Sequence, residues 1–411
     1  MLSYAGEAAV SGVSLVDMIN YLLINVLAAL ATGGAVVVSQ YIGHKEKEES
    51  CFAASQLITI TAVISLGIMF LVLAFHRPML SILFGHTEKD VMKAAVTYFV
   101  FSGLSYPFLA VYNSCAALFR SMGNSRITLA VSIFMNLSNI AGDAIGIFLL
   151  QAGVTGVGVA TLSARAAAAA ILMSLSLNSK NEVFARFADI FKWDGKMIVR
   201  ILNIAVPNGI ENGIYQLGRV LLISLISMFG TAQIAANGIT NSLVMIAISF
   251  ASAMNLAIVT VVGQCVGAGD YEQATYYIKK LVRITYIGTF LLSLSEILLL
   301  PLILHLYSLT AEVSHLTYIL VVIHNAFAIF LWPLAFTFSN GLRAAGDVRF
   351  TMIVSICSMF VLRISCAYIL AIFLHLGVIG VWIAMGLDWT FCSTTFMIRF
   401  KRGKWKNFKV I

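Results

Sequence analysis

The sequence is poor in charge. Only 11% of its 411 residues are charged, while 60% are hydrophobic, whereas a soluble globular protein has about 25% charged and about 45–50% apolar residues. This deficit excludes a soluble enzyme, a nucleic-acid-binding protein and a disordered chain. One membrane-spanning helix needs about 20 apolar residues, so the chain has room for roughly a dozen. Long apolar runs favour helices over a β-barrel, whose strands alternate over about 10 residues.

Sequence patterns for metal binding, secretion and catalysis are also missing. The six cysteines are scattered without a CxxC or Cys/His spacing, so we interpret them as small core residues. Residues 1–10 lack the basic region of a cleavable signal peptide. HExxH, GxSxG and paired Asp motifs are absent, which argues against a membrane-embedded enzyme. We therefore expect neither an enzyme nor an organic cofactor.

Apolar stretches recur along the whole chain and predict an all-α, polytopic membrane protein. Several stretches exceed the minimum spanning length, so tilted or protruding helices are expected. The candidate spans cover about 12–43, 52–75, 91–118, 127–150, 154–177, 203–229, 233–266, 280–304, 315–342, 350–373 and 378–398.

The basic residues predict the orientation of these spans. Of the 26 Lys and Arg residues, 20 lie in every second loop, at the start of the span that follows one of these loops, and in the C-terminal tail. The loops on the opposite side hold only Arg77, Lys89 and Lys93. The positive-inside rule places the first set, with the C-terminus, in the cytoplasm, and residue 1 outside the cell membrane. The net charge of +8 thus indicates topology rather than binding of nucleic acid. The remaining three basic residues, Arg165, Arg219 and Arg363, lie inside spans.

Two halves of the chain repeat one another. Gln40-Tyr-Ile-Gly43 matches Gln264-Cys-Val-Gly267, and Gly153-Val-Thr-Gly-Val157 matches Gly377-Val-Ile-Gly-Val381, both 224 positions apart. Because both copies lie at the same side of the membrane, the repeats are parallel. The second half has six expected spans and the first has five. We therefore expect that the counterpart of 203–229 would precede Met1, and that the chain lacks a first helix.

The expected boundaries follow from this repeat. Residues 1–177 form a first lobe, 178–202 a cytoplasmic linker, 203–398 a second lobe and 399–411 a basic tail. Within the linker, apolar residues at helical spacing predict an amphipathic helix on the inner membrane surface. These residues are Val183, Phe184, Phe187, Ile190 and Phe191, opposite Arg186 and Asp189.

Several motifs resemble those of the multidrug and toxic compound extrusion (MATE) transporters. They are LFRSMGNSR (118–126), GLRAAGDVR (341–349), NxxNxxxD (136–143) with GVTGVGVATLSAR (153–165), PNGIENGIYQLGR (207–219) and VWIAMGLDWTFCSTTFMIRFKRGKW (381–405). The resemblance covers the whole chain, as the equivalent of the family's helices 2 to 12. It implies two pseudo-symmetric six-helix bundles in a V shape, the first with five helices here. It also implies export of small organic, often cationic, compounds against entry of Na⁺ or H⁺.

Charged groups inside spans are costly and are functional candidates. Asn136, Asn139 and Asp143 share one helix face, and spacing from the turn near residue 152 predicts Thr161 at the depth of Asp143. Oxygen ligands suit a hard cation such as Na⁺, and a buried carboxyl suits a proton. By resemblance, Asn139, Asp143 and Thr161 match positions implicated in cation coupling in the family's first lobe. The alternative is that Arg165 simply neutralises Asp143.

The second half carries its own polar groups. Arg363 and Asp388 are expected at one depth, as a structural ion pair. Glu211 follows Pro207 in an Asn/Gly-rich stretch and is a candidate, with His324 and Asn325, for lining a substrate cavity, although Arg219 is an alternative partner that would neutralise it. Helix-bending elements are predicted at Pro107, Pro207 and Pro333. Glu296 stands alone in an apolar helix and receives no assignment.

Four readings of the function remain. The first is a monomeric drug or cation antiporter of the cell membrane, with Na⁺ or H⁺ as its coupling ion and small organic substrates as its partners. A lipid-linked oligosaccharide flippase has a related architecture, but should carry more basic cavity residues for pyrophosphate. The third, a membrane enzyme, is disfavoured by the missing motifs. The fourth is an inactive remnant, because one helix is expected to be missing.

Overall fold

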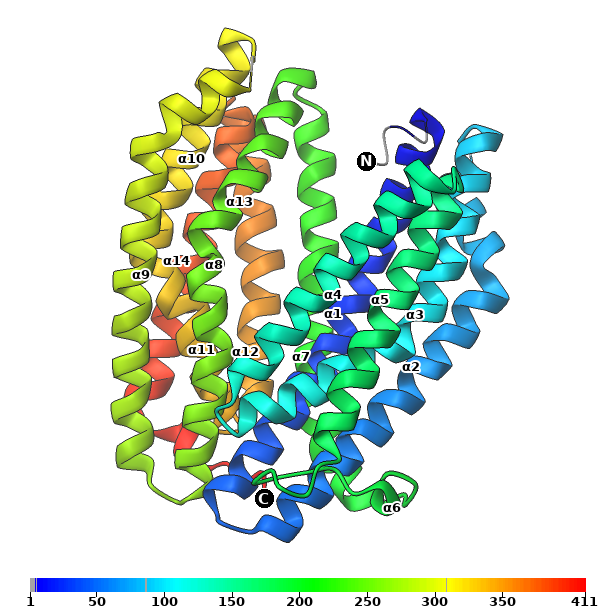
Figure 1. Ribbon diagram of the computed structural model, residues 1–411. Helices are drawn as coiled ribbons and strands as arrows, with labels where there is room; N and C mark the ends of the chain where they lie inside the picture. Colours follow the sequence, from blue (N-terminus) through cyan, green and yellow to red (C-terminus); the bar gives the residue numbers. More distant parts are fainter. Residues whose placement is uncertain (1–3, 5, 86, 308) are drawn as a thin grey trace. The chain divides into compact units, whose positions relative to one another are not determined.

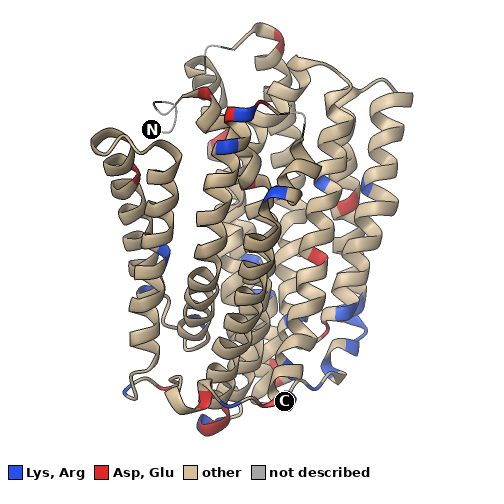
Figure 2. Ribbon diagram, turned by 90° about the vertical axis from the view of Figure 1, so that its right-hand side faces the viewer, with Lys and Arg blue, Asp and Glu red and all other residues tan. Residues whose placement is uncertain are grey.

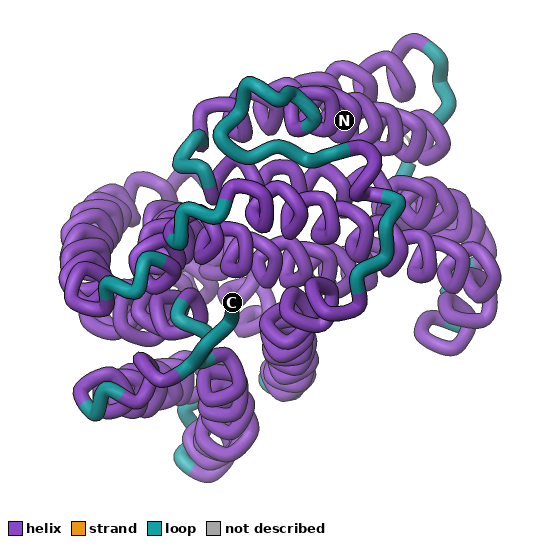
Figure 3. Tube along the Cα trace, turned by 90° about the horizontal axis from the view of Figure 1, so that it is seen from below, coloured by secondary structure: helices purple, strands orange, loops and turns teal. Residues whose placement is uncertain are grey.

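The computed structural model describes residues 4, 6–85, 87–307 and 309–411, and these form helices, turns and loops without a strand (Figures 1 and 3). Residue 1, expected outside the cell, is not among the described residues. The long helices are α1 (Glu7–Gly43), α2 (Lys47–Phe84), α3 (Lys89–Ser121), α4 (Ser125–Ala144), α5 (Gly153–Ser176), α7 (Gly195–Ser227), α8 (Thr231–Gly267), α9 (Tyr271–Leu306), α10 (Ala311–Trp332) and α14 (Gly377–Lys401). The shorter ones are α6 (Phe187–Ile190), α11 (Phe338–Ala344), α12 (Val348–Cys357) and α13 (Ser365–Tyr368).

The internal repeat extends to the bounds of the helices. α1 and α8 are each 37 residues long, and both begin and end 224 positions apart. The turns of the two RxxGxxR motifs also correspond, with Gly123 at φ 75° and Gly346 at φ 96°. Only glycine adopts such angles without steric cost, so each motif ends one helix and starts the next. The sequence prediction of repeated helical halves is confirmed.

The chain forms two compact units, Met1–Gly209 and Ile210–Ile411. The boundary therefore falls inside α7, and not at the linker 178–202. The start of α7 packs on the first unit because small residues allow close approach: a methyl group on Gly33 would lie 2.6 Å from the Ala205 Cβ. Arg200 also donates a hydrogen bond to the Tyr41 hydroxyl. The first turns of α7 thus belong to the first unit.

Ten helices are long and apolar enough to cross a membrane among the described residues. The eleventh expected span, now α7, does not reach that hydropathy because it contains Asn203, Asn208, Glu211 and Arg219. Large apolar side chains are exposed along the spans, for example Phe70 at 64% and Leu298 at 71%, as is normal where lipid is the solvent. Figure 2 shows that most charged residues gather at the helix ends.

The linker differs from its prediction. It is helical only over Phe187–Ile190, and the rest before α7 consists of turns and loop. The buried Gln56 on α2 holds this segment: its Nε2 donates to the carbonyls of Asp189 (2.9 Å) and Lys192 (2.6 Å), and its Oε1 accepts from the Asp194 N–H (3.2 Å). These long-range bonds favour an irregular backbone over a continuous amphipathic helix.

Glu48 on α2 binds the same linker at Arg186. Its carboxylate lies 2.6 Å from Arg186, and this charged hydrogen bond raises the pKa of the Arg186 guanidinium. Phe187 and Phe191 remain exposed and pack edge to face, with ring centroids 5.2 Å apart. The apolar residues of the linker therefore divide: Val183 is buried against the bundle, whereas these two rings face outward.

The C-terminal segment is packed rather than free. After α14 the chain forms a short 3₁₀ turn, Lys404–Asn407, whose Trp405 is fully buried. Its ring stacks on Phe400 with centroids 5.3 Å apart and an interplanar angle of 5°. Arg399 pairs with Asp347 through bonds of 2.7 and 3.1 Å. Arg399 is thus held next to the start of α12.

The cysteines are distributed between core and surface. Cys51, Cys115, Cys265 and Cys392 are buried, whereas Cys357 is exposed and Cys366 is half-buried, and all six thiols are free. The prediction of core cysteines therefore holds for four of them and is wrong for Cys357, because its position on α12 faces outward. Within the described residues, no group of three or more His, Cys, Asp or Glu could hold a metal ion.

Candidate functional site

Close packing of α4 on α5 builds the site in the first unit. A methyl group on Gly146 would lie 2.8 Å from the Gly156 Cα, and one on Gly142 would lie 2.8 Å from the Ala160 Cβ. Such small-residue contacts let two helix backbones approach closely in a membrane. A π-helical turn, Ile145–Leu149, follows directly after Asp143 and its helix, and turns of this kind are frequent at functional sites.

The polar cluster predicted on these helices is present in part. Asn139 Nδ2 donates to the Thr161 hydroxyl at 3.2 Å, one helical turn from Asp143. Asp143 is half-buried, and its Oδ1 is buried without a hydrogen-bond partner among the described residues. Asn136 instead bonds the Ser132 carbonyl of its own helix at 2.9 Å and is exposed. The structure therefore joins Asn139 to Thr161 and separates Asn136 from them.

Arg165 does not neutralise Asp143. Its Nη1 donates to the Ser105 hydroxyl on α3 at 2.7 Å, on the side of the helix where it interacts with Asp17, Tyr98 and Tyr106. No ion pair to Asp143 occurs within the described ranges. A carboxyl group inside the span thus keeps one oxygen available for a cation or a proton.

A buried polar network around Asn20 was missed in the sequence. Asn20 donates to Asp17 (3.2 Å) and to Ser102 (3.1 Å), and accepts from the Tyr106 hydroxyl at 2.6 Å. Asp17 is exposed but belongs to this network through its bond with Asn20. The spacing of Asp17 and Asn20 on one helix face was the available signal, although their partners on α3 are more than 80 positions away.

Arg363 and Asp388 meet in the second unit as predicted. The guanidinium lies 3.7 Å from the carboxylate, and both side chains are buried. Arg363 also donates to the Tyr215 hydroxyl at 2.7 Å, and the Ser358 hydroxyl donates to Asp388 Oδ1. Arg363 stands in a π-helical segment, Ser358–Ile364. The added hydrogen bonds compensate two charges that burial would otherwise make costly.

Glu211 has a partner that the sequence analysis placed in a loop. Arg343 Nη2 lies 2.5 Å from Glu211 Oε1, and Arg343 also bonds Asn340 (3.2 Å) and Thr351 (3.3 Å). The expected alternative partner, Arg219, forms no ion pair in the described part of the chain. Because Arg343 neutralises Glu211, this carboxylate is poorly suited to hold a cationic substrate.

The other two candidate cavity residues are enclosed by protein. His324 is 3% exposed, and its ring packs between Trp382 and Trp389 with centroid distances of 5.8 and 5.5 Å. Asn325 is fully buried and donates to Glu296 at 3.1 Å. The second unit has a small cavity beside Arg219 and Arg363, and none of the three candidates, Glu211, His324 and Asn325, lines it.

That small cavity has two arginines in its wall. Its polar lining consists of Arg219, Arg363, Asn237 and Asn241, and Trp382 and Met385 contribute part of its apolar wall. The Trp382 Nε1 donates to the Asn237 side chain at 3.1 Å, which fixes the indole ring. Among the described residues no acidic side chain lines it, so its polarity differs from that of the Asp143 cluster in the first unit.

The helical fold agrees with a comparison to known families. The family model MatE matches residues 1–145 and 207–369. The chain belongs to the MatE family. It is therefore a multi-pass membrane transporter, as the resemblance in the sequence implied.

Curated relatives of this MatE chain align over most of its length. An "Uncharacterized transporter YisQ" of Bacillus subtilis is 26% identical over 398 residues, which cover 94% of this chain and 85% of that protein. A "Probable multidrug resistance protein NorM" of Thermotoga maritima is 25% identical over 423 residues, which cover 100% of this chain and 88% of that protein.

Solved structures show the same fold. A MATE protein in its bent conformation superposes with a TM-score of 0.90 at 18% identity, over 98% of this chain and 90% of that one. A MOP superfamily transporter from Pyrococcus furiosus, described as having a binding pocket of reverse polarity, gives a TM-score of 0.91 at 18% identity, over 99% and 91%. At this identity the likeness establishes the fold of the MatE chain and no further property.

The prolines of this MatE transporter interrupt its helices differently. Pro333 starts a π-helical segment, Pro333–Thr337, between α10 and α11. Pro107 and Pro207 lie inside α3 and α7, and both helices continue past them. Proline removes one backbone hydrogen bond in each case, so a role in bending stays a prediction at all three positions.

Proposed function

We propose that this chain is a secondary active antiporter that exports small organic, often cationic, compounds in exchange for Na⁺ or H⁺. The observation that carries the proposal is the buried oxygen of Asp143 that has no hydrogen-bond partner among the described residues, one turn from the Asn139–Thr161 pair. A charged carboxyl inside a membrane span needs a counterpart. The relatives named as probable multidrug resistance proteins support organic compounds as the exported class.

In this mechanism Asp143 is the group that takes the coupling ion. Carboxylate, amide and hydroxyl oxygens from α4 and α5 are ligands suited to Na⁺, and the same carboxyl accepts a proton when no metal ion is held. Either occupant neutralises Asp143 and removes the cost of its charge in the apolar bundle. Asn139 and Thr161 position the neighbouring oxygens, and no organic cofactor takes part.

The experiment is efflux from proteoliposomes driven by an imposed Na⁺ or H⁺ gradient. Asp143→Asn keeps the size of the side chain but removes its negative charge, so ion-driven efflux should be lost while membrane insertion is retained. Asn136→Ala is the matched control on the same helix, since Asn136 is exposed and bonds its own helix. Full gradient-driven efflux by Asp143→Asn would show that coupling does not depend on this carboxyl.

A second candidate function, export of an organic anion, is favoured by the cavity wall that contains Arg219 and Arg363. Arg219 has no ion-pair partner in the described part of the chain, and guanidinium groups bind carboxylates and phosphates in a bidentate manner. A lipid-linked phosphate, as carried by flippases, belongs to the same class. Arg219→Gln should abolish export of an organic anion and leave export of an organic cation unchanged, if this candidate is correct.

We further propose that the transporter acts as a monomer in the cell membrane with its C-terminus in the cytoplasm. The support for the orientation is the distribution of basic residues, 20 in one set of loops and the C-terminal tail and three in the opposite loops, because cytoplasmic loops retain Lys and Arg.

A further inference from the structure

A stripe of buried polar side chains follows one face of α9. Thr285, Thr289 and Ser293 are fully buried, and Glu296 is 6% exposed. Their spacing of four, four and three positions places them on the same side of the helix, which packs against α8 and α10. The Thr289 and Ser293 hydroxyls and one Glu296 oxygen have no hydrogen-bond partner among the described residues.

Glu296 contacts one polar side chain of α10. Asn325 Nδ2 donates to Glu296 Oε2 at 3.1 Å. The two atoms that remain, Glu296 Oε1 and Asn325 Oδ1, are both buried oxygens without a partner in the described ranges. Two oxygens that only accept cannot bond one another, and each buried acceptor without a partner is unfavourable. The contact as it stands is therefore half complete.

Among the described residues, no ion pair compensates Glu296. On α8 there is no Asp, Glu, Lys, Arg or His, and the π-helical segment Pro333–Thr337 has none either. Arg343 on α11 is paired with Glu211, and His324 on α10 packs between two tryptophans. The remaining charged or titratable groups of α8, α9 and α10 lie at helix ends or toward the surface: Tyr271, Glu272, Tyr276, Tyr277, Lys279, Lys280, Arg283, Tyr286 and His305 on α9, Glu312, His315 and Tyr318 on α10, and Cys265 on α8.

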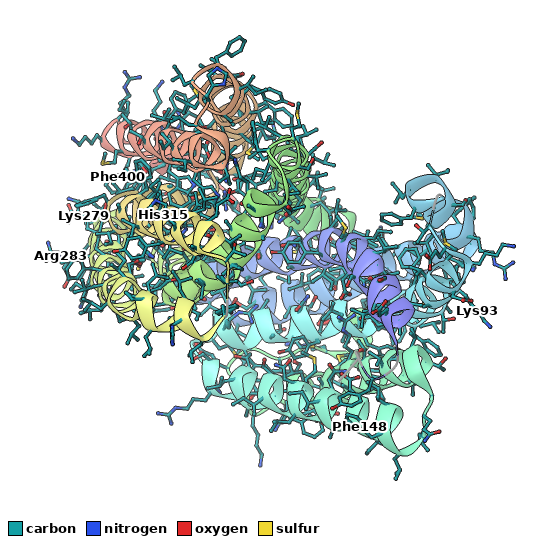
Figure 4. All side chains as sticks on the ribbon, turned by 90° about the horizontal axis from the view of Figure 1, so that it is seen from above. Lys93, Phe148, Lys279, Arg283, His315 and Phe400 are labelled. Atoms are coloured by element: carbon teal, nitrogen blue, oxygen red, sulfur yellow. The ribbon has the colours of Figure 1, made fainter. Side chains whose placement is uncertain are left out.

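Figure 4 labels two of the basic residues of α9, Lys279 and Arg283. Lys279 and Arg283 point away from the helix bundle of their unit, and both are exposed. Arg283 is 13 positions before Glu296 on α9, which corresponds to about 20 Å along a helix. An ionised Glu296 would thus be an isolated negative charge inside a span, and such a placement is costly.

We propose that Glu296 and Asn325 form a proton-binding site, in which Glu296 is protonated on Oε1 and this O–H donates a hydrogen bond to Asn325 Oδ1. The proton comes from water and adds to the carboxylate, so that no other bond is formed or broken. Acid and amide then share two hydrogen bonds, one in each direction, and both leftover oxygens are satisfied by a single proton. The site lies in the second unit, whereas the Asp143 cluster lies in the first.

The ligand of this site is a proton and not a metal ion. The hydroxyls near Glu296 and the amide of Asn325 add only neutral oxygens, and within the described residues no group of three or more His, Cys, Asp or Glu could hold a metal ion. A neutral acid also explains how a carboxyl group is retained on a helix whose neighbours provide no cation. The proposal does not depend on which compound the transporter exports.

Infrared spectroscopy of the purified full-length chain in lipid at pH 7 tests the proposal directly. A protonated carboxylic acid has a C=O stretching band that a carboxylate lacks. Glu296→Gln should remove one such band from the wild-type spectrum, while Asn325→Leu should keep the band and shift it, because the acid loses its hydrogen-bonded partner. Exchange into D₂O should shift the same band in the wild type without any substitution.

The matched control is Glu211→Gln, another buried Glu of the same unit that is paired with Arg343 and should contribute no acid band. The proposal is overturned if Glu296→Gln leaves the acid bands unchanged and removes a carboxylate band instead. Conversion of the wild-type acid band to a carboxylate band by Na⁺ at constant pH would also overturn it, since the site would then prefer a metal ion. If Glu296→Gln does not fold, Asn325→Leu still decides: a shifted acid C=O band supports the proposal, and an unshifted band overturns it.

Discussion

The amide of Asn139 donates a hydrogen bond to the hydroxyl of Thr161 at 3.2 Å and so links α4 to α5 beside Asp143. Removing either partner should weaken the packing of these helices, because a net side-chain hydrogen bond contributes about 1 kcal/mol. We expect Asn139→Ala and Thr161→Val to be non-additive in a double-mutant cycle measured by thermal unfolding in detergent. Strict additivity would mean that the two groups do not act as a pair.

The glycine contact between the same helices should be sensitive to a single methyl group. Gly156→Ala would place its Cβ 2.8 Å from the Gly146 Cα, and overpacking of this kind costs about 1–3 kcal/mol. We expect a lower melting temperature and a loss of coupled efflux, since the separation of α4 and α5 sets the Asn139–Thr161 distance. Gly67→Ala is the control because nothing lies within 4 Å of the added methyl group.

The buried pair of Arg363 and Asp388 should respond to charge reversal in a characteristic way. Each single reversal leaves two like charges in an apolar bundle. It should lower the free energy of unfolding by about 3–5 kcal/mol or more, as breaking a buried pair does. The double change, Arg363→Asp with Asp388→Arg, should recover part of that loss in unfolding measurements. Arg402→Asp, at an exposed position, controls for reversal itself. A double variant less stable than both singles would contradict a purely structural pair.

The linker should lose its order when Gln56 is replaced. Gln56→Leu leaves the carbonyls of Asp189 and Lys192 and the N–H of Asp194 without their side-chain partner, at about 1–3 kcal/mol for each buried group. We expect faster proteolytic cleavage within 178–194 in detergent. The exposed Gln273 gives the control, Gln273→Leu. Equal cleavage rates in both variants would show that Gln56 does not hold the segment.

Cysteine labelling tests the orientation. In a background without the six native cysteines, Ser179→Cys lies in a predicted cytoplasmic loop and Glu88→Cys in a predicted external one, and both positions are exposed. A membrane-impermeant maleimide added to intact cells should label Glu88→Cys alone, and permeabilisation should make Ser179→Cys reactive. Labelling of Ser179→Cys in intact cells would reverse the assigned topology.

The sequence by itself determined the fold class, the helical spans and the repeat. Apolar runs of spanning length leave the backbone no option but helices in lipid, and glycines at matching positions fix the turns, so α1 and α8 were predicted near their actual ends. The pair Arg363–Asp388 also followed, since two helices joined by a short turn bring residues at nearly equal distances from it together. The same rule placed Thr161 at the depth of Asp143, whereas the hydrogen bond of Thr161 is to Asn139, one helical turn away.

Only the tertiary structure decided which partners the other polar groups have. Arg343 stands 132 positions from Glu211, and Gln56 stands 133 positions from Asp189, so neither contact follows from helix spacing. The same holds for Glu296, which appears isolated in the sequence until α10 brings Asn325 beside it. Helix periodicity gives the face on which a residue lies, but the neighbour of that face depends on how the helices pack.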